Sequence, residues 1–277
     1  MDPLVYFIEK GLREKGKSPK TIRAYQYALF NFEKWLQAVE TDLENFGRSD
    51  VQQYIDELAD NKKSAATINS YFAAIRSFAR FYERPETVSD IRIVKTPNLM
   101  KEAPVALEKN ERQRIKREID RTGHKRDIAI ILTLLYTGIR VSELVNLDID
   151  DVEASERKGS LTVRHGKGNK PRKLPLHPEV RRALRQYIDE RTDEDPALFL
   201  STHKKRISVR SVQHLCNKYG VNPHKFRHTL VTNLVDQGQD DETIRTITGH
   251  EHVNMIARYR SVREEDKEAA ISSLYMD

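Results

Sequence analysis

Near its end, the chain of 277 residues carries Tyr259, which follows several groups of basic side chains. These groups lie around Arg140, around Lys167 and in the run His224-Lys225-Phe226-Arg227-His228, and Gly249-His250 comes after them. A phenol can attack a phosphodiester when the phosphate oxygens are neutralised and the attacking and leaving groups are held in line. Arginines and histidines supply that charge without a metal ion, so these residue types predict cleavage of a DNA phosphodiester by Tyr259.

The run of basic residues is predicted to begin a helix, because Asn222-Pro223 is a favourable cap followed by proline in the first turn. Three basic side chains then fall at positions i, i+3 and i+4 on one face, namely His224, Arg227 and His228. The free backbone amides and the dipole of a helix start favour an anion. We therefore expect a phosphate at this helix end, with Arg140 as a second guanidinium group beside it.

Tyr259 needs help from its surroundings, because a phenol with a pKa of about 10 is a poor nucleophile at neutral pH. Arg258 and Arg260 flank it and would favour the phenolate. His250 precedes Tyr259 by nine residues, which on one unbroken helix would place the two side chains on opposite faces. For both to serve one site the chain must bend between them, and Gly249 and Asn254 are the expected places for the break. Taken alone, a tyrosine near a chain end is more often a packing residue than a nucleophile.

The net charge of +6 is modest, but the charge is distributed unevenly. Residues 1–84 nearly balance, with 13 Lys/Arg against 12 Asp/Glu, whereas residues 201–228 hold seven Lys/Arg and no acid. Residues 157–182 are almost as one-sided. Clustered cations bind polyanions through counterion release, so we expect DNA to lie across the second half of the chain. The simpler alternative is a solvated basic face.

The composition fits a globular protein that works in the cytoplasm. Hydrophobic residues make up 38%, and the longest apolar run, Ile128 to Tyr136, is too short to span a membrane. The start of the chain lacks the pattern of a signal peptide. The single cysteine, Cys216, cannot form an intrachain disulfide. His, Cys and carboxylate residues show no convincing metal spacing, so neither a metal nor another cofactor is expected.

The first part of the chain is predicted to be a helical domain over residues 1–84. Four helices are expected because apolar residues recur with helical spacing: one near residues 3–15, one after a Ser18-Pro19 cap, one from a Ser49 cap to about Ala59, and one that Ser64 opens. Residues 85–104 contain three prolines without a sustained period and are expected to form a linker.

The second domain, residues 105–277, is predicted to be mostly helical with one small sheet. Two strands, Leu161 to His165 and Arg172 to Leu176, are expected to flank a glycine-containing turn that presents Lys167. Helices are expected over residues 108–121, 124–137, 178–190, 208–219, 223–237, 240–247 and 263–274.

These motifs resemble the tyrosine recombinase family, in its compact Xer-like and transposon-resolvase forms. The resemblance lies in Thr137-Gly138-Ile139-Arg140-Val141-Ser142-Glu143-Leu144, Gly166-Lys167-Gly168-Asn169-Lys170, His224-x-x-Arg227-His228, Gly249-His250 and Tyr259. It spans residues 105–277, and the helical unit before them is similar to that family's core-binding, SAM-like domain. One departure is that Met255 and Ile256 stand where many relatives have threonines.

The resemblance implies a mainly α two-domain clamp around double-stranded DNA. Tyr259 would form a 3′-phosphotyrosyl link, and strand exchange would pass through a Holliday junction without metal or nucleotide cofactor. Its implied catalytic residues are Arg140, Arg227 and His250 for the transition state, Lys167 as the acid, His224 in proton transfer and Tyr259 as nucleophile. Glu143 is expected to orient Arg140, and His228 is expected to be structural.

The expected DNA contacts are basic residues in both domains: Arg76, Arg80, Lys170, Arg172, Lys173, Lys204, Lys205, Arg206, Arg210 and Lys225. The resemblance also implies a homotetramer on specific recombination sites, with the C-terminal helix docking in trans. An apolar stripe between Arg263 and Tyr275 is a candidate for that contact, and packing against its own domain is an equal alternative.

Three other functions remain open at this point. A type IB topoisomerase would use a similar catalytic set but rejoin the original strand. A non-catalytic DNA-binding protein would keep only the basic surface. A metal-dependent nuclease built on His224 and His228 has the least support, because no carboxylate cluster accompanies them.

Overall fold

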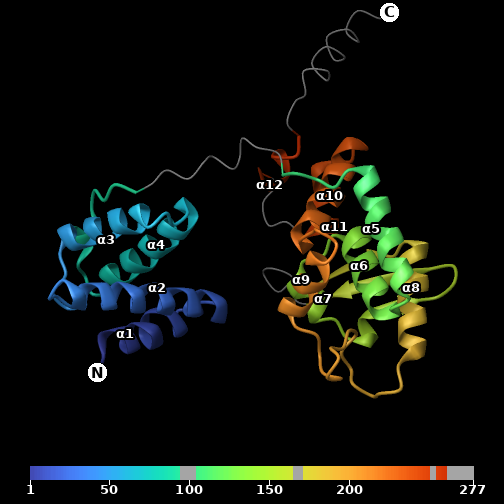
Figure 1. The fold of residues 1–277 in the computed structure, drawn as a ribbon, viewed down its shortest axis with the longest axis horizontal. Helices are drawn as coiled ribbons and strands as arrows, with labels where there is room; N and C mark the ends of the chain where they lie inside the picture. Colours follow the sequence, from blue (N-terminus) through green and yellow to red (C-terminus); the bar gives the residue numbers. More distant parts are fainter. Residues whose placement is uncertain (94–103, 165–170, 250–253, 261–277) are drawn as a thin grey trace, which may run out of the picture. The chain divides into compact units, whose positions relative to one another are not determined.

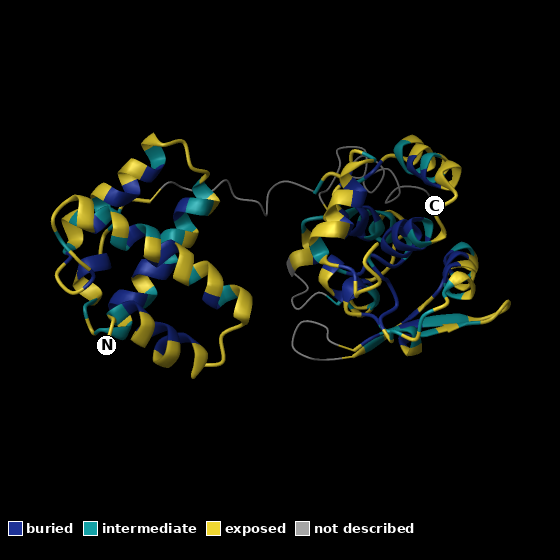
Figure 2. Ribbon diagram, turned by 60° about the horizontal axis from the view of Figure 1, so that its bottom comes forward, coloured by how far each residue is buried: buried dark blue, intermediate teal, exposed yellow. Residues whose placement is uncertain are grey.

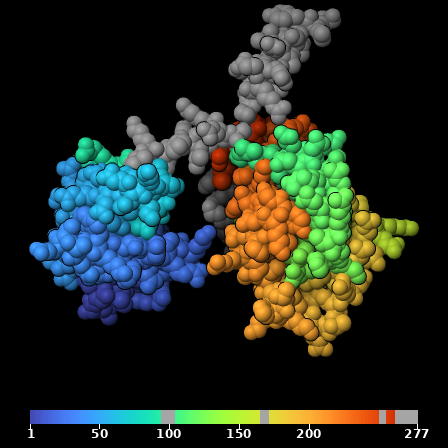
Figure 3. All heavy atoms as spheres, viewed as in Figure 1, coloured from blue at the N-terminus to red at the C-terminus, as the bar shows by residue number. Residues whose placement is uncertain are grey.

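The computed structural model divides the chain into two compact units, Met1–Asn98 and Leu99–Asp277 (Figure 1). It describes residues 1–93, 104–164, 171–249 and 254–260. Each unit is a closely packed body (Figure 3). The predicted fold class is confirmed, since the described residues form helices and one small three-stranded sheet.

The first unit is entirely helical in its described part. It contains α1 (Pro3–Tyr6), the π-helix η1 (Phe7–Arg13), α2 (Pro19–Ala38), α3 (Arg48–Asp60), α4 (Ala65–Phe81) and the 3-10 helix η2 (Pro85–Val88). The serine caps predicted for α2 and α4 are confirmed. Ser18 Oγ accepts a hydrogen bond from the Thr21 amide, and Ser64 Oγ accepts one from the Thr67 amide. Buried aromatic rings join these helices, with Phe32 packed edge-on against Phe46.

Two details of this unit differ from the sequence-based expectation. The first helix is not continuous α-helix, because the chain widens into a π-helix where Gly11 lies against the Phe7 ring. A Cβ atom on Gly11 would lie only 2.5 Å from that ring. The third helix begins after Gly47 rather than at a Ser49 cap, since the Gly47 amide donates a 2.7 Å hydrogen bond to Asp50.

The start of the segment expected to be a linker packs on the first unit. Thr87 and Val88 are buried, and Val88 belongs to the same apolar core as the helices. The Arg92 amide donates a 2.8 Å hydrogen bond to Gln52 on α3. The chain therefore remains attached to the first unit at least to Arg92, while residues 94–103 lie outside the described residues.

The second unit combines helices with an antiparallel sheet in the order β1-β2-β3. Its elements are α5 (Lys109–Thr122), α6 (Lys125–Thr137), α7 (Val141–Val145), the 3-10 helix η3 (Ile149–Asp151), β1 (Val152–Ala154), β2 (Gly159–Val163), β3 (Arg172–Pro175), α8 (Pro178–Glu190), α9 (Val209–Asn217), α10 (Pro223–Asp236), α11 (Asp241–Thr248) and α12 (Asn254–Ala257). The short β1 and α7 were not predicted. The helix expected over residues 263–274 lies outside the described residues.

Helix α6 lies at the centre of the second unit. Ala129, Ile130, Ile131 and Leu134 on it are completely buried, and α8 and α10 pack against it. Figure 2 shows buried residues gathered in the interior of each unit. None of the helices in the described parts of the chain is long and apolar enough to cross a lipid bilayer. The buried α6 is thus a core helix, and the turn at Gly138 follows directly from its C-terminal end.

That turn depends on Gly138, which ends α6 in the left-handed conformation with φ +58°. A Cβ atom there would lie 2.6 Å from Leu230 Cδ2 on α10. A side chain at residue 138 would therefore require Leu230 to shift, in addition to the strain of the left-handed backbone.

Replacing Gly138 by alanine should destabilise the protein by about 2–4 kcal/mol, from left-handed strain and overpacking against Leu230. Gly123 provides the matched control, because it ends α5 at φ +66° with nothing within 4 Å of an added Cβ. Gly123→Ala should cost only the strain, about 1–2 kcal/mol. Urea unfolding measures both, and equal losses would contradict a close contact between the turn and α10.

Candidate active site

A buried glutamate, Glu143 on α7, organises the candidate site. Its side-chain oxygens accept hydrogen bonds from the Arg140 amide and guanidinium, both at 2.8 Å. Arg172 on β3 donates two more, at 3.1 and 2.7 Å. Burial alone would raise the pKa of Glu143, but these hydrogen bonds and positive charges bring it below its ordinary value. One ionised carboxylate therefore fixes two arginines that come from different elements.

The same two arginines hold the end of α11. Arg172 Nε donates to the Ile247 carbonyl at 3.2 Å, and Arg140 Nη2 donates to the Gly249 carbonyl at 3.0 Å. Gly249 has φ +67°, and a Cβ atom on it would lie 2.9 Å from Arg172 Nη1. The predicted end of the helix at Gly249 is confirmed, since α11 ends at Thr248 and α12 begins at Asn254. His250, the next residue, lies outside the described residues.

Helix α10 adds a third arginine. Its predicted cap is confirmed, because the Asn222 side chain accepts a 3.0 Å hydrogen bond from the Lys225 amide. Arg227, in the first turns, is only 5% exposed, and its Nη1 donates to the Gly138 carbonyl at 2.9 Å. Burial, followed by repulsion from Arg140, lowers the pKa of Arg227 to about 10.

One edge of the Arg227 guanidinium has no acceptor among the described residues. Its Nη2 atom is buried and makes no hydrogen bond within the described part of the chain. A buried, charged donor without a partner is costly, and an anion that enters the site would remove that cost. Together with the start of α10, this orphan donor marks a place for an oxyanion.

Tyr259 follows α12, and its hydroxyl lies 2.5 Å from His228 Nδ1 on α10. Burial raises the pKa of Tyr259, and the positive charges of Arg227 and Arg258 act against that rise. The tyrosine is anchored by its neighbour Ile256, which is completely buried against Val231 and Ile244. The phenol is therefore held next to the start of α10, within the electrostatic reach of Arg227.

The structure thus brings together Arg140, Glu143, Arg227 and Tyr259, as the sequence suggested. His224 lies one turn before His228 on α10 and is exposed. Lys167 lies outside the described residues, as does His250. His228, which we expected to be structural, forms a hydrogen bond with the tyrosine hydroxyl. The sequence signal for it was its position four residues after His224, on the same helix face.

Arg172 corrects the list of expected DNA contacts. Its side chain is only 10% exposed and binds Glu143, so it supports the site from within instead of facing solvent. Arg206 donates to the Val145 and Leu147 carbonyls and pairs with Asp148, but it is exposed and stays a predicted contact.

The other expected DNA contacts fall into three groups. Lys173 forms an ion pair with Glu153 at 2.9 Å, and Lys225 forms one with Glu111 at 3.4 Å. Lys170 lies outside the described residues. The remaining side chains are exposed and stay predicted contacts; they are Arg76, Arg80, Lys204, Lys205 and Arg210.

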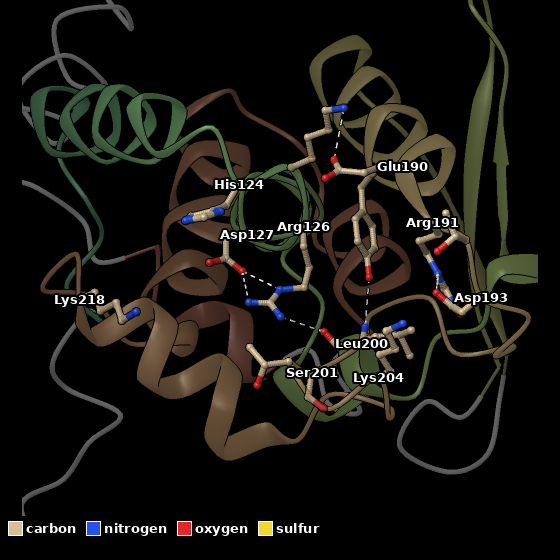
Figure 4. Close-up of a pocket in the computed structure, with 14 residues that line it drawn as sticks. His124, Arg126, Asp127, Glu190, Arg191, Asp193, Leu200, Ser201, Lys204 and Lys218 are labelled. Carbon is tan, nitrogen blue, oxygen red and sulfur yellow. Dashed lines mark hydrogen bonds and ion pairs between the residues drawn. The ribbon is translucent and has the colours of Figure 1, made fainter.

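A separate cleft of about 550 Å³ lies at the opposite end of α6 (Figure 4). Helix α6 has 13 residues, which corresponds to about 20 Å at 1.5 Å per residue. Several of the cleft's charged groups are paired, with Lys125 bound to Glu190 and Arg126 to Asp127, and its Lys204 and Lys218 are exposed to solvent. It therefore lacks the unpaired buried cation that distinguishes the Arg227 site. Within the described residues, no three His, Cys, Asp or Glu side chains gather as a metal site.

Comparison with known proteins assigns both units. Residues 106–266 match the phage integrase family, and residues 5–85 match the N-terminal SAM-like domain of phage integrases. The chain is 32% identical to the tyrosine recombinase XerA of Thermococcus kodakarensis, over 91% of this chain and 88% of the relative. It is 28% identical to the tyrosine recombinase XerC of Treponema denticola, over 92% of both chains.

Two solved structures show the same fold. One is the XerH site-specific recombinase bound to its difH substrate, with a TM-score of 0.73 at 19% identity, covering 97% of this chain and 83% of that one. The other is the Tn1549 transposon integrase in complex with a circular intermediate DNA. Its TM-score is 0.76 at 18% identity, covering 98% of this chain and 99% of that one.

The role of Arg172 can be tested by stability. Arg172→Met should destabilise the second unit by about 3–5 kcal/mol, because it leaves the buried Glu143 charge with half its partners. Lys173→Met, one residue along the same strand, removes an ion pair whose lysine is 56% exposed and should cost at most about 1 kcal/mol. Urea unfolding distinguishes them, and a loss below about 1 kcal/mol for Arg172→Met would refute the supporting role.

Proposed function

Because the chain belongs to the phage integrase family and is a tyrosine recombinase, we propose that Tyr259 cleaves and rejoins DNA at specific sites through a 3′-phosphotyrosyl intermediate. The observation that carries this proposal is the buried, unpaired Nη2 of Arg227, next to a tyrosine hydroxyl at the start of α10. A scissile phosphate supplies the missing acceptor. In this position the phosphate would also interact with the positive end of α10 and with the Arg140 guanidinium.

In the proposed reaction, the Tyr259 oxygen bonds to phosphorus and the bond from phosphorus to the 5′-oxygen breaks. The departing oxygen takes a proton from Lys167 and becomes a free hydroxyl. The 5′-hydroxyl of the partner strand then attacks the phosphotyrosyl link and releases Tyr259. Since each step exchanges one phosphate ester for another, no nucleotide cofactor is needed, and one round of exchange forms a Holliday junction.

The positive groups act on the charge that develops at phosphorus. Arg227 and Arg140 bind the non-bridging oxygens, and donors arranged in this way before the reaction stabilise a transition state efficiently. His250 is proposed to bind the same phosphate, and His224 to assist proton transfer. Glu143 does not touch the phosphate in this scheme. It holds Arg140 in place through the contacts described above.

The proposed partner is double-stranded DNA carrying recombination sites, bound by the two units as a clamp. The exposed lysines and arginines of both units would contact its phosphates and set the salt dependence of binding. Exchange between two duplexes requires four active sites, so we propose a homotetramer on DNA whose C-terminal segment docks on a neighbouring copy.

Cleavage by Tyr259 predicts a covalent product. DNA from the native host incubated with the wild type and denatured should yield a protein-linked strand, whose sequence identifies the site. With a duplex of that sequence, Tyr259→Phe should form no adduct but bind with an affinity within about twofold of the wild type, since only one hydroxyl is lost. Chelation of divalent metals should leave the wild-type adduct unchanged.

The same experiment separates the alternatives. DNA binding by the wild type without any adduct indicates a non-catalytic protein. A supercoiled plasmid with two sites should yield exchanged flanking sequences, whereas relaxation without exchange indicates a topoisomerase.

The proposed assembly is tested by truncation after Ser261. The shortened protein should still bind a single site but should fail to hold two sites in one complex, because the docking segment is removed. Native gel electrophoresis with DNA that carries one or two sites measures this. Unchanged assembly would exclude docking by this segment.

A further inference from the structure

The reaction proposed above requires Tyr259 to lose its proton, and among the described residues His228 lies within hydrogen-bond distance of its hydroxyl. The Tyr259 hydroxyl lies 2.5 Å from Nδ1 of His228. The two ring centroids are 5.9 Å apart, with the planes inclined by 37°. Such a short contact between a phenol and an imidazole nitrogen is a hydrogen bond along which a proton can move.

The surroundings of His228 keep its imidazole neutral before DNA binds. Its side chain is half-buried, and burial is the main reason that its pKa lies below the ordinary value. The positive fields of His224, Arg258 and Arg227 act in the same direction. No carboxylate in the described part of the chain adds a contribution that raises it. A neutral imidazole has one free nitrogen lone pair, which is what a proton acceptor needs.

The other groups near the hydroxyl are less suited to this task. Arg227 and Arg258 are cations that lower the pKa of the phenol but cannot take its proton. His224 is exposed, and in the described part of the chain it is His228, not His224, that forms the hydrogen bond with the Tyr259 hydroxyl. The hydroxyl therefore has an acceptor from α10 and a stabilising field from two arginines.

We propose that His228 is a further catalytic residue, whose Nδ1 takes the proton of Tyr259 as the phenol oxygen bonds to phosphorus. The O–H bond breaks, an N–H bond forms, and the resulting imidazolium returns the proton when the next 5′-hydroxyl displaces Tyr259. This inference rests on the proposed function. It adds that the phosphate itself turns on the base, because a bound anion offsets the positive field that opposes protonation of His228.

The test measures the rate of adduct formation on the identified site. His228→Asn retains a hydrogen-bond acceptor near the position of Nδ1 but cannot accept a proton. At pH 7 it should react about 10²–10⁴-fold more slowly than the wild type, which is the usual range for a general base. His124→Asn, at the far end of α6, is the matched control and should react at the wild-type rate.

Changing the acidity of the Tyr259 phenol shows whether His228 acts as a base or only positions the ring. Replacing Tyr259 by a fluorinated tyrosine, whose phenol ionises more readily, should restore much of the rate in the His228→Asn protein. If His228 only positioned the ring, fluorination would restore nothing, and the proposal would be overturned.

A third experiment separates the role of His228, which accepts the proton of Tyr259, from that of Lys167, which gives a proton to the leaving oxygen. In a duplex with sulfur in place of the bridging 5′-oxygen, the leaving thiolate needs no proton. The deficit of Lys167→Ala should then vanish, and that of His228→Asn should persist. Loss of both deficits would overturn the assignment of His228.

If His228→Asn fails to fold, the wild type still decides the question. The rise of its cleavage rate with pH should keep the same midpoint when Tyr259 is fluorinated, because the titrating group is the imidazole. A midpoint that follows the acidity of the phenol would overturn the proposal. If the wild type forms no adduct, the proposed function is refuted together with this inference. If the wild type and His228→Asn form the adduct at equal rates, only the assignment of His228 is refuted.

Discussion

The candidate site depends on one charge imbalance in a buried place. Glu143 is ionised and almost completely buried, and it neutralises only part of the charge of Arg140, Arg172 and Arg227, which surround it. Charges interact strongly where water is excluded, so burial and the repulsion from Arg140 lower the pKa of Arg227. In the described part of the chain, its Nη2 atom also lacks a hydrogen-bond acceptor. A phosphate is the natural complement of this surplus. In the proposed reaction, binding of the phosphate would remove the cost of a donor that has no partner among the described residues.

Backbone carbonyls share the task of fixing the arginines. Gly138 and Gly249 each end a helix in the left-handed conformation, and their carbonyls accept hydrogen bonds from Arg227 and Arg140 respectively. Both turns lie so close to their neighbours that a Cβ atom would collide, in one case with Leu230 and in the other with Arg172. Each guanidinium is therefore bound to a backbone carbonyl whose position is fixed by a tight turn. This limits how far either guanidinium can move.

The sequence predicted what is decided locally. Caps at Ser18 and Asn222 and the end of α6 at Gly138 depend on a few neighbouring residues, and the structure confirms them. It could not reveal the partner of Arg172, because Glu143 lies 29 residues earlier and only the fold brings the two together. Lys173, its neighbour on the same strand, is half-exposed. A basic residue type alone therefore could not show that Arg172 supports the site from within while Lys173 is a surface charge. The contact between His228 and Tyr259 spans 31 residues and was missed for the same reason.

The surroundings of the phenol would keep the proposed nucleophile protonated until DNA binds. Without an anion nearby, burial keeps the pKa of Tyr259 raised and that of His228 lowered, so the shared proton stays on the phenol. A phosphate bound by Arg227 would place negative charge beside the imidazole and withdraw part of the positive field from it. Proton transfer then becomes easier at the moment when the electrophile is present. In this view the arginines bind the substrate and, through the same charges, decide when the tyrosine can react.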